Sequence, residues 1–333
     1  MTEQSPATAV AEQPETARRS HAHVVLVTGA AGFVGTHVCR QLTNRRMRVR
    51  GFVHSPAKAA ERLAQLPVDV HVGDVRDTAA LRRAMQGCDA VVHLAAIAIE
   101  RRGQSYEDVN AIGTRNILDT MRAVGVRRIV HMSQNFAVST SRHRFLRSKG
   151  LAEEAVRASG TEWTVLRPSV IFGPDDEFVN VLARLVRLSP LLYPLPGGGK
   201  ARFQPIGVDD VARVVAASLE HTTTIGRAYD LGGPAQLTLR QMVERILVAM
   251  EVRRILIPLP TAILRPLIAV AQRVLPRPPV TTELLDLLAV DNVVSGNALR
   301  DEFHIAPTPF APEELGYLKH ITARDALRSL MGR

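Results

Sequence analysis

The sequence predicts an α/β protein: a Rossmann-type, doubly wound parallel sheet followed by a smaller C-terminal lobe. Strand-like apolar runs alternate with helix-like stretches through the first half of the chain. This repetition implies right-handed βαβ units with helices on both faces of the sheet. A glycine-rich turn joins the first run to the first helix-like stretch, as in doubly wound folds that bind dinucleotides. After residue 168 prolines and glycines accumulate, and there we expect the second lobe to begin.

Six short runs are predicted to be strands. They cover residues 24–27, 48–53, 69–72, 90–94, 128–132 and 163–166. The helices between them are expected to run through Arg45, from Pro56, from Thr78, up to Val124 and from about Arg147. The predicted organisation is a disordered tail over 1–21, a Rossmann domain over 22–172 and a smaller lobe over 173–333, from which some segments return to the first domain.

Length and composition narrow the class of protein. A chain of 333 residues can bury one large core, or a core and a smaller lobe. Its two cysteines, Cys39 and Cys88, have no CxxC spacing, so we expect neither a metal site nor a disulfide. No uninterrupted apolar run is long enough to span a bilayer, and we expect a cytoplasmic protein. The net charge of +10 is dispersed over many arginines, aromatics are few, and no nucleic-acid partner is expected.

The glycine-rich turn, TGAAGFVG at residues 28–35, lies between a strand-like run and a helix-like stretch. One glycine can make a tight turn, one can let the backbone approach phosphates and one can let helix and strand pack closely. The helix N-terminus adds N–H groups and a positive dipole for the pyrophosphate. We therefore predict a dinucleotide site. The residues expected at the pyrophosphate are Gly29, Ala31, Gly32, Phe33, Val34 and Gly35.

The ends of the second and third strands bear on the adenosine half of the cofactor. Asp74, followed by Val75, is placed to accept a hydrogen bond from the adenine amino group. The alternative is an aspartate that only shapes a turn. After the second strand the sequence has no carboxylate for the ribose hydroxyls, and only His54, Ser55 and Lys58 offer donors. This composition favours NADP(H) over NAD(H).

Further segments carry a resemblance to a known family. GD at 73–74, HLAA at 93–96, NxxGTxN at 110–116, LRP at 166–168 and VDDVA at 208–212 look like an extended or atypical short-chain dehydrogenase/reductase. FLRSKGLAEE at 145–154, RPSVIFGPDDEF at 167–178, GGGKARFQP at 197–205 and DNVVS at 291–295 resemble the NADPH-binding alpha-subcomplex-9 accessory subunits of respiratory complex I and their bacterial relatives. The resemblance implies that Leu94, Ala95, Ala96, Lys149 and Pro168 also line the cofactor groove.

In catalytic members of this family a tyrosine and a lysine four residues apart share one helix face. The lysine holds the nicotinamide ribose and lowers the tyrosine pKa, so that the phenol exchanges a proton with the substrate. Here Lys149 is present, but Phe145 stands at the tyrosine position and has no proton to give. The assisting group is Ser133 in one register of the strand end and Asn135 in the other. Tyr106 could in principle supply the acid from the preceding helix, but no spacing argument places it there, and a core or exposed tyrosine is the favoured interpretation. No catalytic residue is assigned.

Two functional hypotheses follow. A complete cofactor groove beside a missing acid favours a weakly catalytic or non-catalytic NAD(P)H-binding protein, which acts as an accessory or assembly component of a membrane-associated NADH:quinone oxidoreductase. The alternative is an active NAD(P)H-dependent reductase, dehydrogenase or epimerase on a lipid-, quinone- or isoprenoid-like substrate. The expected partners are the dinucleotide and either respiratory-complex subunits or the inner face of a membrane. The oligomeric state stays open.

The stretch from 255 to 275 is mostly apolar, but prolines and arginines interrupt it too often for a membrane span. Over 260–275 we expect a helix with one apolar side, because residues three and four apart share a helix face. That side is expected to carry Leu264, Leu267, Ile268 and Ala271, with Arg265 and Arg273 near the interface. Such a helix could dock on lipid or a partner, or it could line the substrate lobe.

Overall fold

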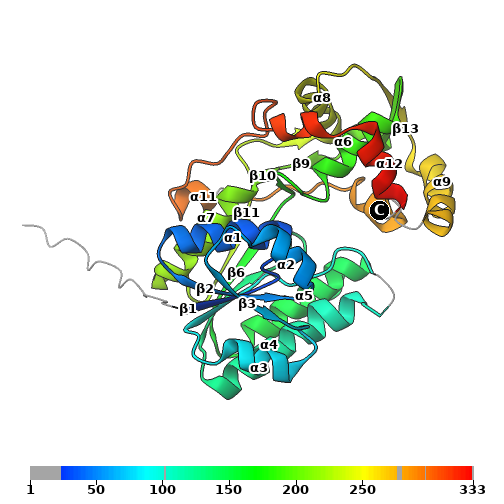
Figure 1. Cartoon of the computed structure of the whole chain (residues 1–333). Coiled ribbons are helices and arrows are strands. Elements are labelled where there is room, and N and C mark those ends of the chain that lie inside the picture. Colours follow the sequence, from blue (N-terminus) through cyan, green and yellow to red (C-terminus); the bar gives the residue numbers. More distant parts are fainter. Residues whose placement is uncertain (1–23, 101–102, 276–279, 297, 332–333) are drawn as a thin grey trace, which may run out of the picture.

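The computed structural model describes residues 24–100, 103–275, 280–296 and 298–331, and its centre is a seven-stranded parallel sheet (Figure 1). The strand order is β11-β6-β5-β4-β1-β2-β3. The strands are β1 (Val24–Thr28), β2 (Arg48–Val53), β3 (Val68–Val72), β4 (Ala90–His93), β5 (Arg128–Met132), β6 (Glu162–Pro168) and β11 (Arg227–Leu231). The predicted Rossmann-type sheet is confirmed. The predicted tail over 1–21 lies outside the described residues.

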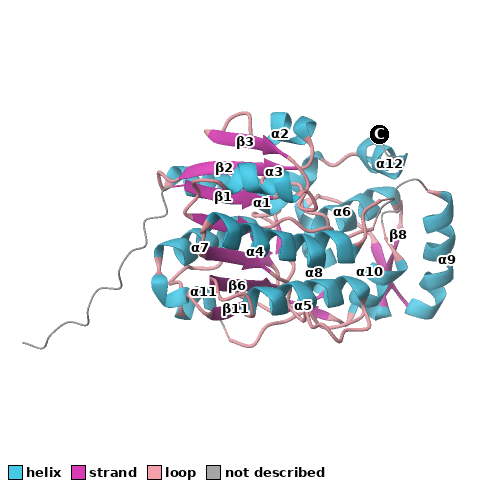
Figure 2. Ribbon diagram, turned by 90° about the horizontal axis from the view of Figure 1, so that it is seen from below, coloured by secondary structure: helices cyan, strands magenta, loops and turns pink. Residues whose placement is uncertain are grey.

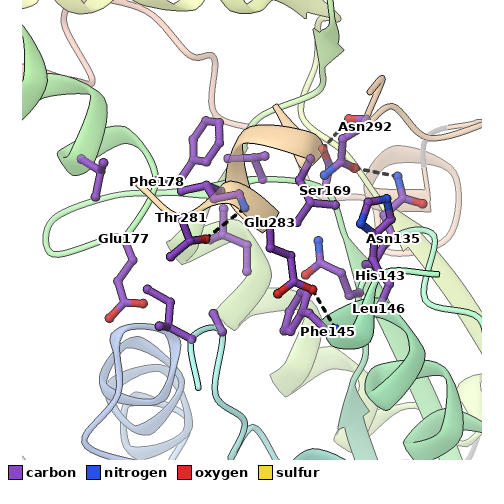
Figure 3. Close-up of a pocket in the computed structure, with 18 of the residues that line it drawn as sticks. Asn135, His143, Phe145, Leu146, Ser169, Glu177, Phe178, Thr281, Glu283 and Asn292 are labelled. Atoms are coloured by element: carbon purple, nitrogen blue, oxygen red, sulfur yellow. Dashed lines mark hydrogen bonds between the residues drawn. The ribbon is translucent and has the colours of Figure 1, made fainter. Parts of the chain in front are cut away.

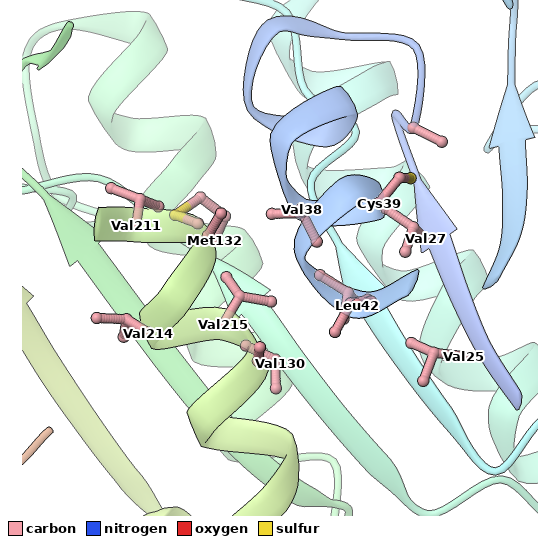
Figure 4. Close-up of a cluster of buried hydrophobic side chains, with 14 of the residues drawn as sticks. Val25, Val27, Val38, Cys39, Leu42, Val130, Met132, Val211, Val214 and Val215 are labelled. Atoms are coloured by element: carbon pink, nitrogen blue, oxygen red, sulfur yellow. The ribbon is translucent and has the colours of Figure 1, made fainter. Parts of the chain in front are cut away.

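Both faces of this sheet are mostly apolar because the inner strands carry apolar residues at successive positions, with polar residues such as Thr28 and His93 at the strand ends. In β1, Val25 and Val27 face one core cluster while Leu26 faces the other. The first cluster lies under α1 (Phe33–Asn44) and α7 (Val208–Glu220), as Figure 4 shows. The second lies under α3 (Thr78–Met85), α4 (Gly113–Val124) and α5 (Arg144–Arg157). A short helix, α2 (Pro56–Arg62), joins β2 to β3.

Two features of the Rossmann unit differ from the sequence-based expectation. Helix α5 begins at Arg144, three residues before the predicted start, so the whole segment from Phe145 to Lys149 is helical. The seventh strand, β11, was not predicted, because it follows the start of the C-terminal lobe in sequence. It pairs in parallel with β6 and forms one edge of the sheet, while α7 packs on α1.

The C-terminal lobe has its own core, which lies between α6 (Val179–Leu188), α8 (Leu239–Ala249) and the chain end. Small strand pairs join its loops: β7 (Ile171–Phe172) with β10 (Ile206–Gly207), β9 (Arg202–Phe203) with β12 (Leu237–Thr238), and β8 (Leu192–Pro196) with β13 (Ile255–Leu259). The remaining elements are η1 (Glu107–Ile112), η2 (Gly197–Gly199), η3 (Thr222–Thr224), α9 (Thr261–Val274), α10 (Thr282–Leu287), α11 (Ala298–Asp301), η4 (Gly316–His320) and α12 (Ala323–Met331).

Helix α9 lies at the far edge of this lobe, away from the sheet (Figure 2). The expected single stripe is wrong. Leu264 is buried and Ile268 and Ala271 are half-buried, whereas Leu267 is exposed on another face. The exposed apolar residues of this helix are Ile263, Leu267, Val270 and Val274.

The arginines of α9 also differ from the expectation. Arg265 is already paired, because its Nη1 and Nη2 lie 3.1 and 3.2 Å from the carboxylate of Asp286 on α10. Arg273 is exposed. Within the described ranges, no helix is long and apolar enough to cross a bilayer.

Candidate functional site

The glycine turn brings backbone atoms of β1 and α1 into contact at the sheet edge. Gly29 has a φ of +71°, a conformation that glycine adopts at little cost. A Cβ at Gly35 would lie 2.1 Å from the carbonyl oxygen of Gly29, so only glycine allows the helix to pack this closely. The packing of this turn therefore requires both glycines.

Gly32 has a different role, because it is exposed and forms the N-cap of α1 without any side-chain cap. A Cβ there would touch only the Gly29 carbonyl oxygen, at 3.0 Å, and would otherwise project into open space. No acidic residue lies in the first turn, which contains Phe33, Val34 and Gly35. The N-terminus of α1 is therefore open to an anion, as a pyrophosphate requires.

At the adenosine end, Asp74 is held by its neighbour. Arg76 donates from Nε to Oδ1 at 2.9 Å and from Nη2 to Oδ2 at 2.7 Å, and the hydrogen bonds of Arg76 are the main cause that lowers the pKa of Asp74. His54 Nδ1 lies 3.4 Å from the same carboxylate. Val75 is buried beneath this turn and packs against Gly113. The ionised carboxylate keeps lone pairs for an adenine amino group.

A buried hydrogen-bond network fixes the loop after β4. Its members belong to segments that carry the family resemblance, but the sequence did not show that they bond to one another. Thr28 Oγ1 accepts the backbone N–H groups of Leu94 and Ala95, each at 3.2 Å, and therefore donates to His93 Nδ1 at 2.7 Å. His93 Nε2 then donates to Thr114 Oγ1 at 2.9 Å. Burial, and then the charge of Lys149, lowers the pKa of His93 to about 3, so the imidazole stays neutral. The loop that continues through Ala96 is thereby held at the carboxyl edge of the sheet.

Lys149 and Phe145 lie one turn apart on α5. The Lys149 ammonium is buried and donates to the carbonyl oxygen of Met132 at 2.6 Å. Burial lowers the pKa of Lys149 to about 8, against the opposing charge of Glu153. The strand end at Pro168 is also buried, and its carbonyl accepts the N–H of Asn135 at 3.1 Å.

The structure separates the two candidates for the assisting group. Ser133 Oγ is buried and donates to Glu153 Oε2 at 2.8 Å, in a cluster that includes Arg167. Asn135 lines a cavity instead, and its Nδ2 donates to Asn292 Oδ1 at 2.9 Å. The geometry thus brings Asn135, and not Ser133, to the open side of the site.

That cavity, of about 660 Å³, lies between the carboxyl ends of β5 and β6 and the C-terminal lobe (Figure 3). Most of its lining is apolar. These residues include Phe33, Ile99, Phe136, Phe145, Leu146, Val170, Ile171, Phe178, Val181, Phe203, Leu284, Leu287 and Val290. Glu283 of α10 enters the cavity and accepts the Phe145 N–H at 3.2 Å, as Figure 3 shows.

Tyr106 is buried, which is one of the two interpretations drawn from the sequence. It lines the cavity, and its ring centroid lies 5.7 Å from that of Phe145. It immediately precedes the π-helix η1, a type of turn that is frequent at functional sites. In η1, Asn110 bonds both the Ile97 N–H and Ser148 Oγ, and so ties this turn to α5. No spacing in the sequence points from Tyr106 to Phe145.

Comparison with known proteins agrees with this geometry. The model of the NAD(P)H-binding family matches residues 29–222. The chain belongs to that family. It is 32% identical over 294 residues to the NADH dehydrogenase [ubiquinone] 1 alpha subcomplex subunit 9 of Arabidopsis thaliana, covering 83% of this chain and 72% of that protein. The resemblance drawn from the sequence is confirmed.

Other relatives of this NAD(P)H-binding chain are named as enzymes. It is 33% identical over 195 residues to the ceramide reductase of Caulobacter vibrioides, covering 58% of this chain and 60% of that protein. The NADPH-dependent quinone oxidoreductase QOR2 of Escherichia coli matches with a TM-score of 0.70 at 22% identity, over 88% of this chain and 99% of that one. This last likeness shows the fold alone.

The residues predicted for the dinucleotide site fit a pyrophosphate at the start of α1, whereas the usual proton donor of the family is replaced on α5. The cradle at Gly32, the free start of α1 and the buried Lys149 ammonium fit a dinucleotide. The ring of Phe145 replaces the phenol that usually exchanges the proton. The arrangement can hold a nicotinamide cofactor beside an apolar cavity. If the protein reduces a substrate, a side chain other than residue 145 must donate the proton.

Proposed function

We propose that this protein is an NAD(P)H-dependent reductase that acts on an apolar carbonyl compound of lipid, quinone or isoprenoid type. The observation that carries the proposal is the cavity of about 660 Å³ with a mostly apolar lining beside Phe145. A pocket of this kind binds a ligand through its apolar surface and orients it with a few polar groups.

In this proposal different residues of the chain bind different parts of the cofactor and the substrate. The backbone from Gly29 to Gly35 binds the pyrophosphate, and Asp74 and Val75 receive the adenine. Lys149, with its ammonium buried behind the sheet edge, holds the nicotinamide ribose. When bound, the cofactor supplies a hydride. The apolar lining excludes water and aligns the substrate's carbonyl beside Phe145.

NADPH is the cofactor we expect. The turn after β2 carries His54 and Lys58, both exposed, and no carboxylate that would repel a 2′-phosphate. Ser55 caps α2 by accepting the Lys58 N–H at 3.4 Å, which fixes this turn. Calorimetry with NADPH and NADH checks the preference. Lys58→Ala is expected to weaken NADPH binding while leaving NADH binding unchanged, and equal losses for both would contradict it.

Turnover with defined substrates tests the reaction. The purified chain is incubated with NADPH and a panel of long-chain ketones, short-chain quinones and isoprenoid aldehydes, with small polar ketones as the comparison. We expect oxidation of NADPH with at least one apolar class and none with the polar compounds. Leu287→Trp, which fills the cavity, should raise KM. Val248→Trp, at an exposed site on α8, is the matched control and should leave KM unchanged.

A second candidate function is an accessory or assembly role in a membrane-associated NADH:quinone oxidoreductase. Two observations favour it: the similarity to the Arabidopsis subunit over 83% of this chain, and the exposed apolar face of α9. The protein would then be attached peripherally at the inner face of the membrane, through lipid or subunits of that complex. Purification of the full chain from its native membranes tests this role, because stoichiometric respiratory subunits are expected only if it holds.

A further inference from the structure

Phe145 leaves the reductase without its usual acid, so the other polar groups of the cavity become candidates. Several are already engaged elsewhere. The Ser169 Oγ proton is used in a bond to the Asn292 carbonyl at 2.8 Å. Thr281 Oγ1 is held as the N-cap of α10 by the Leu284 N–H at 3.1 Å, and nothing orients its proton toward Phe145. Asp291 is paired with Arg202 at the rim. Tyr106 also carries a hydroxyl, and its ring packs directly against the ring of Phe145.

We propose that Tyr106 donates the proton to the substrate oxygen in place of the hydroxyl that Phe145 lacks, and that Glu283 positions it. This inference rests on the proposed reductase function. It assigns a catalytic residue from the turn before η1 rather than from α5. It also makes the C-terminal lobe part of the catalytic site, since Glu283 lies on α10.

The contacts of Glu283 show how it would position the tyrosine. Its Oε1 accepts the backbone N–H of Phe145 at 3.2 Å, and its Oε2 accepts the Tyr106 hydroxyl at 3.3 Å. The same hydroxyl lies 3.0 Å from the carbonyl oxygen of Ala98. One phenolic proton thus faces two acceptors on the edge of the cavity, and a substrate carbonyl that enters would offer it a third. Glu283 fixes the distance between this hydroxyl and α5.

The charged groups around Tyr106 keep it protonated. Glu283 faces it from α10, and Glu100 accepts its backbone N–H at 2.9 Å. Arg144 of α5 lies 6.0 Å from its ring centroid and is paired with Glu100. Burial first, and then the charge and hydrogen bond of Glu283 and the charge of Glu100, raise the pKa of Tyr106, which the Arg144 guanidinium partly opposes. The phenol is therefore protonated at neutral pH. Because a raised pKa also opposes proton release, the assignment rests on the position of the hydroxyl beside Phe145 and not on its acidity.

The proposed step is balanced. Reduction moves a hydride from C4 of the dihydronicotinamide to the carbonyl carbon, and the π electron pair of the C=O bond moves to oxygen. The Tyr106 Oη–H bond breaks as the new O–H bond forms. NADPH is oxidised to NADP⁺ and the carbonyl is reduced to an alcohol. The tyrosinate then recovers a proton from solvent that enters after the product leaves.

Single-turnover oxidation of NADPH by the full chain, with a substrate identified from the panel above, tests the assignment. Tyr106→Phe is expected to slow the step by about 10²- to 10⁴-fold, with unchanged KM, NADPH affinity and unfolding temperature. Tyr193→Phe, at a buried tyrosine of the C-terminal core, is the matched control and should retain the full rate.

Glu283 is tested as a positioning residue. Glu283→Ala should lower kcat about tenfold without raising KM, whereas Glu283→Gln keeps an oxygen that accepts the hydroxyl and should restore most of the rate. Equal rates in the two variants would overturn the positioning role, because a hydrogen bond would then make no difference.

The remaining outcomes distinguish a failure of the Tyr106 assignment from a failure of the proposed reductase function. A wild-type chain that oxidises no NADPH with any substrate overturns the proposed function and this inference with it. A wild-type chain that turns over while Tyr106→Phe stays within threefold of it overturns the inference alone. A loss in His143→Gln, with Tyr106→Phe unaffected, would assign the proton to His143, which lines the same cavity.

Discussion

The two halves of the cofactor groove are built in different ways. The half that we assign to the pyrophosphate is made from backbone atoms of one continuous segment, residues 28–35, between β1 and α1. The half that we assign to the nicotinamide and the substrate is made from side chains of segments far apart in the sequence, such as Tyr106 and Glu283, which are 177 residues apart. The first has the glycines that the family pattern requires, whereas the second has Phe145 where the family has a tyrosine.

This difference has a physical cause. A backbone cradle depends on glycines because an added side chain there would clash with the turn or fill the space of the phosphates, so a change removes cofactor binding or the fold itself. A proton can be donated from any hydroxyl that reaches the same point in space. The catalytic side of such a groove can therefore be rebuilt from new side chains while the phosphate side stays fixed. The following predictions test that contrast.

Gly35→Ala should have the largest effect. The added Cβ would lie 2.1 Å from the Gly29 carbonyl oxygen. Neither the backbone at residue 35 nor that at Gly29 can move away without separating α1 from β1. We expect the free energy of unfolding to fall by more than about 4 kcal/mol. Chemical denaturation followed by circular dichroism measures it. A variant that unfolds at the wild-type denaturant concentration would show that this turn has more freedom than its geometry indicates.

Gly32→Val should leave the fold intact but abolish cofactor binding. The N-cap conformation of Gly32, with φ −77° and ψ 173°, is open to any residue, while the side chain would fill the space above the start of α1. We expect NADPH affinity to fall at least about 100-fold, since the pyrophosphate loses its close approach to the backbone. Gly316→Val, at an open glycine of the C-terminal lobe, is the control. Unchanged affinity by calorimetry would remove this turn from the binding site.

The sequence predicts the fold and the phosphate cradle because both depend on local patterns. Strand-like runs and the glycine turn are contiguous, and the strand after the start of the C-terminal lobe, β11, was the only part of the main sheet that was missed. The C-terminal half of the site depends on tertiary contacts that no local pattern records. Tyr106 and Glu283 meet only because α10 folds back over α5, and the sequence around either residue carries no sign of the other.

Helix α9 shows a second limit of sequence analysis. The sequence predicted the helix itself, but the segment is apolar on nearly every side, so helical periodicity could not say which face is buried. Contacts with α10 decide this, and they turn Leu264 inward and Leu267 outward. The same packing pairs Arg265 with Asp286, a contact that spacing along the chain does not reveal.

Lys149→Met should have an intermediate effect with a defined pH dependence. Because burial lowers the pKa of Lys149 from 10.5 to about 8, the folded chain releases this proton before the unfolded chain does. The unfolded state therefore binds more protons between these pH values, and the stability of the wild type should rise through this window by on the order of 1–3 kcal/mol relative to the variant.

Denaturation of both proteins at several pH values checks this sign. Lys200→Met, at an exposed lysine, is the control and should follow the wild type. The Lys149 variant should also bind NADPH more weakly below pH 8, where the wild-type ammonium is charged. A variant with the same pH dependence as the wild type would mean that Lys149 is solvated in the folded chain.

The smallest effect on stability is expected from Leu267→Asp combined with Val270→Asp on the outer face of α9. Both side chains are more than half exposed, so the free energy of unfolding should change by no more than about 0.5 kcal/mol, and NADPH binding should be unchanged.

If this face docks on a membrane or a respiratory subunit, the double variant should be released from native membranes, because two charges on an apolar contact face oppose burial. Ile268→Asp, on the inner face, is the contrasting variant and should destabilise the lobe instead. Retention of the double variant on membranes would remove α9 as a docking surface and weaken the accessory role, whereas loss of NADPH binding would show that the two halves of the molecule are coupled.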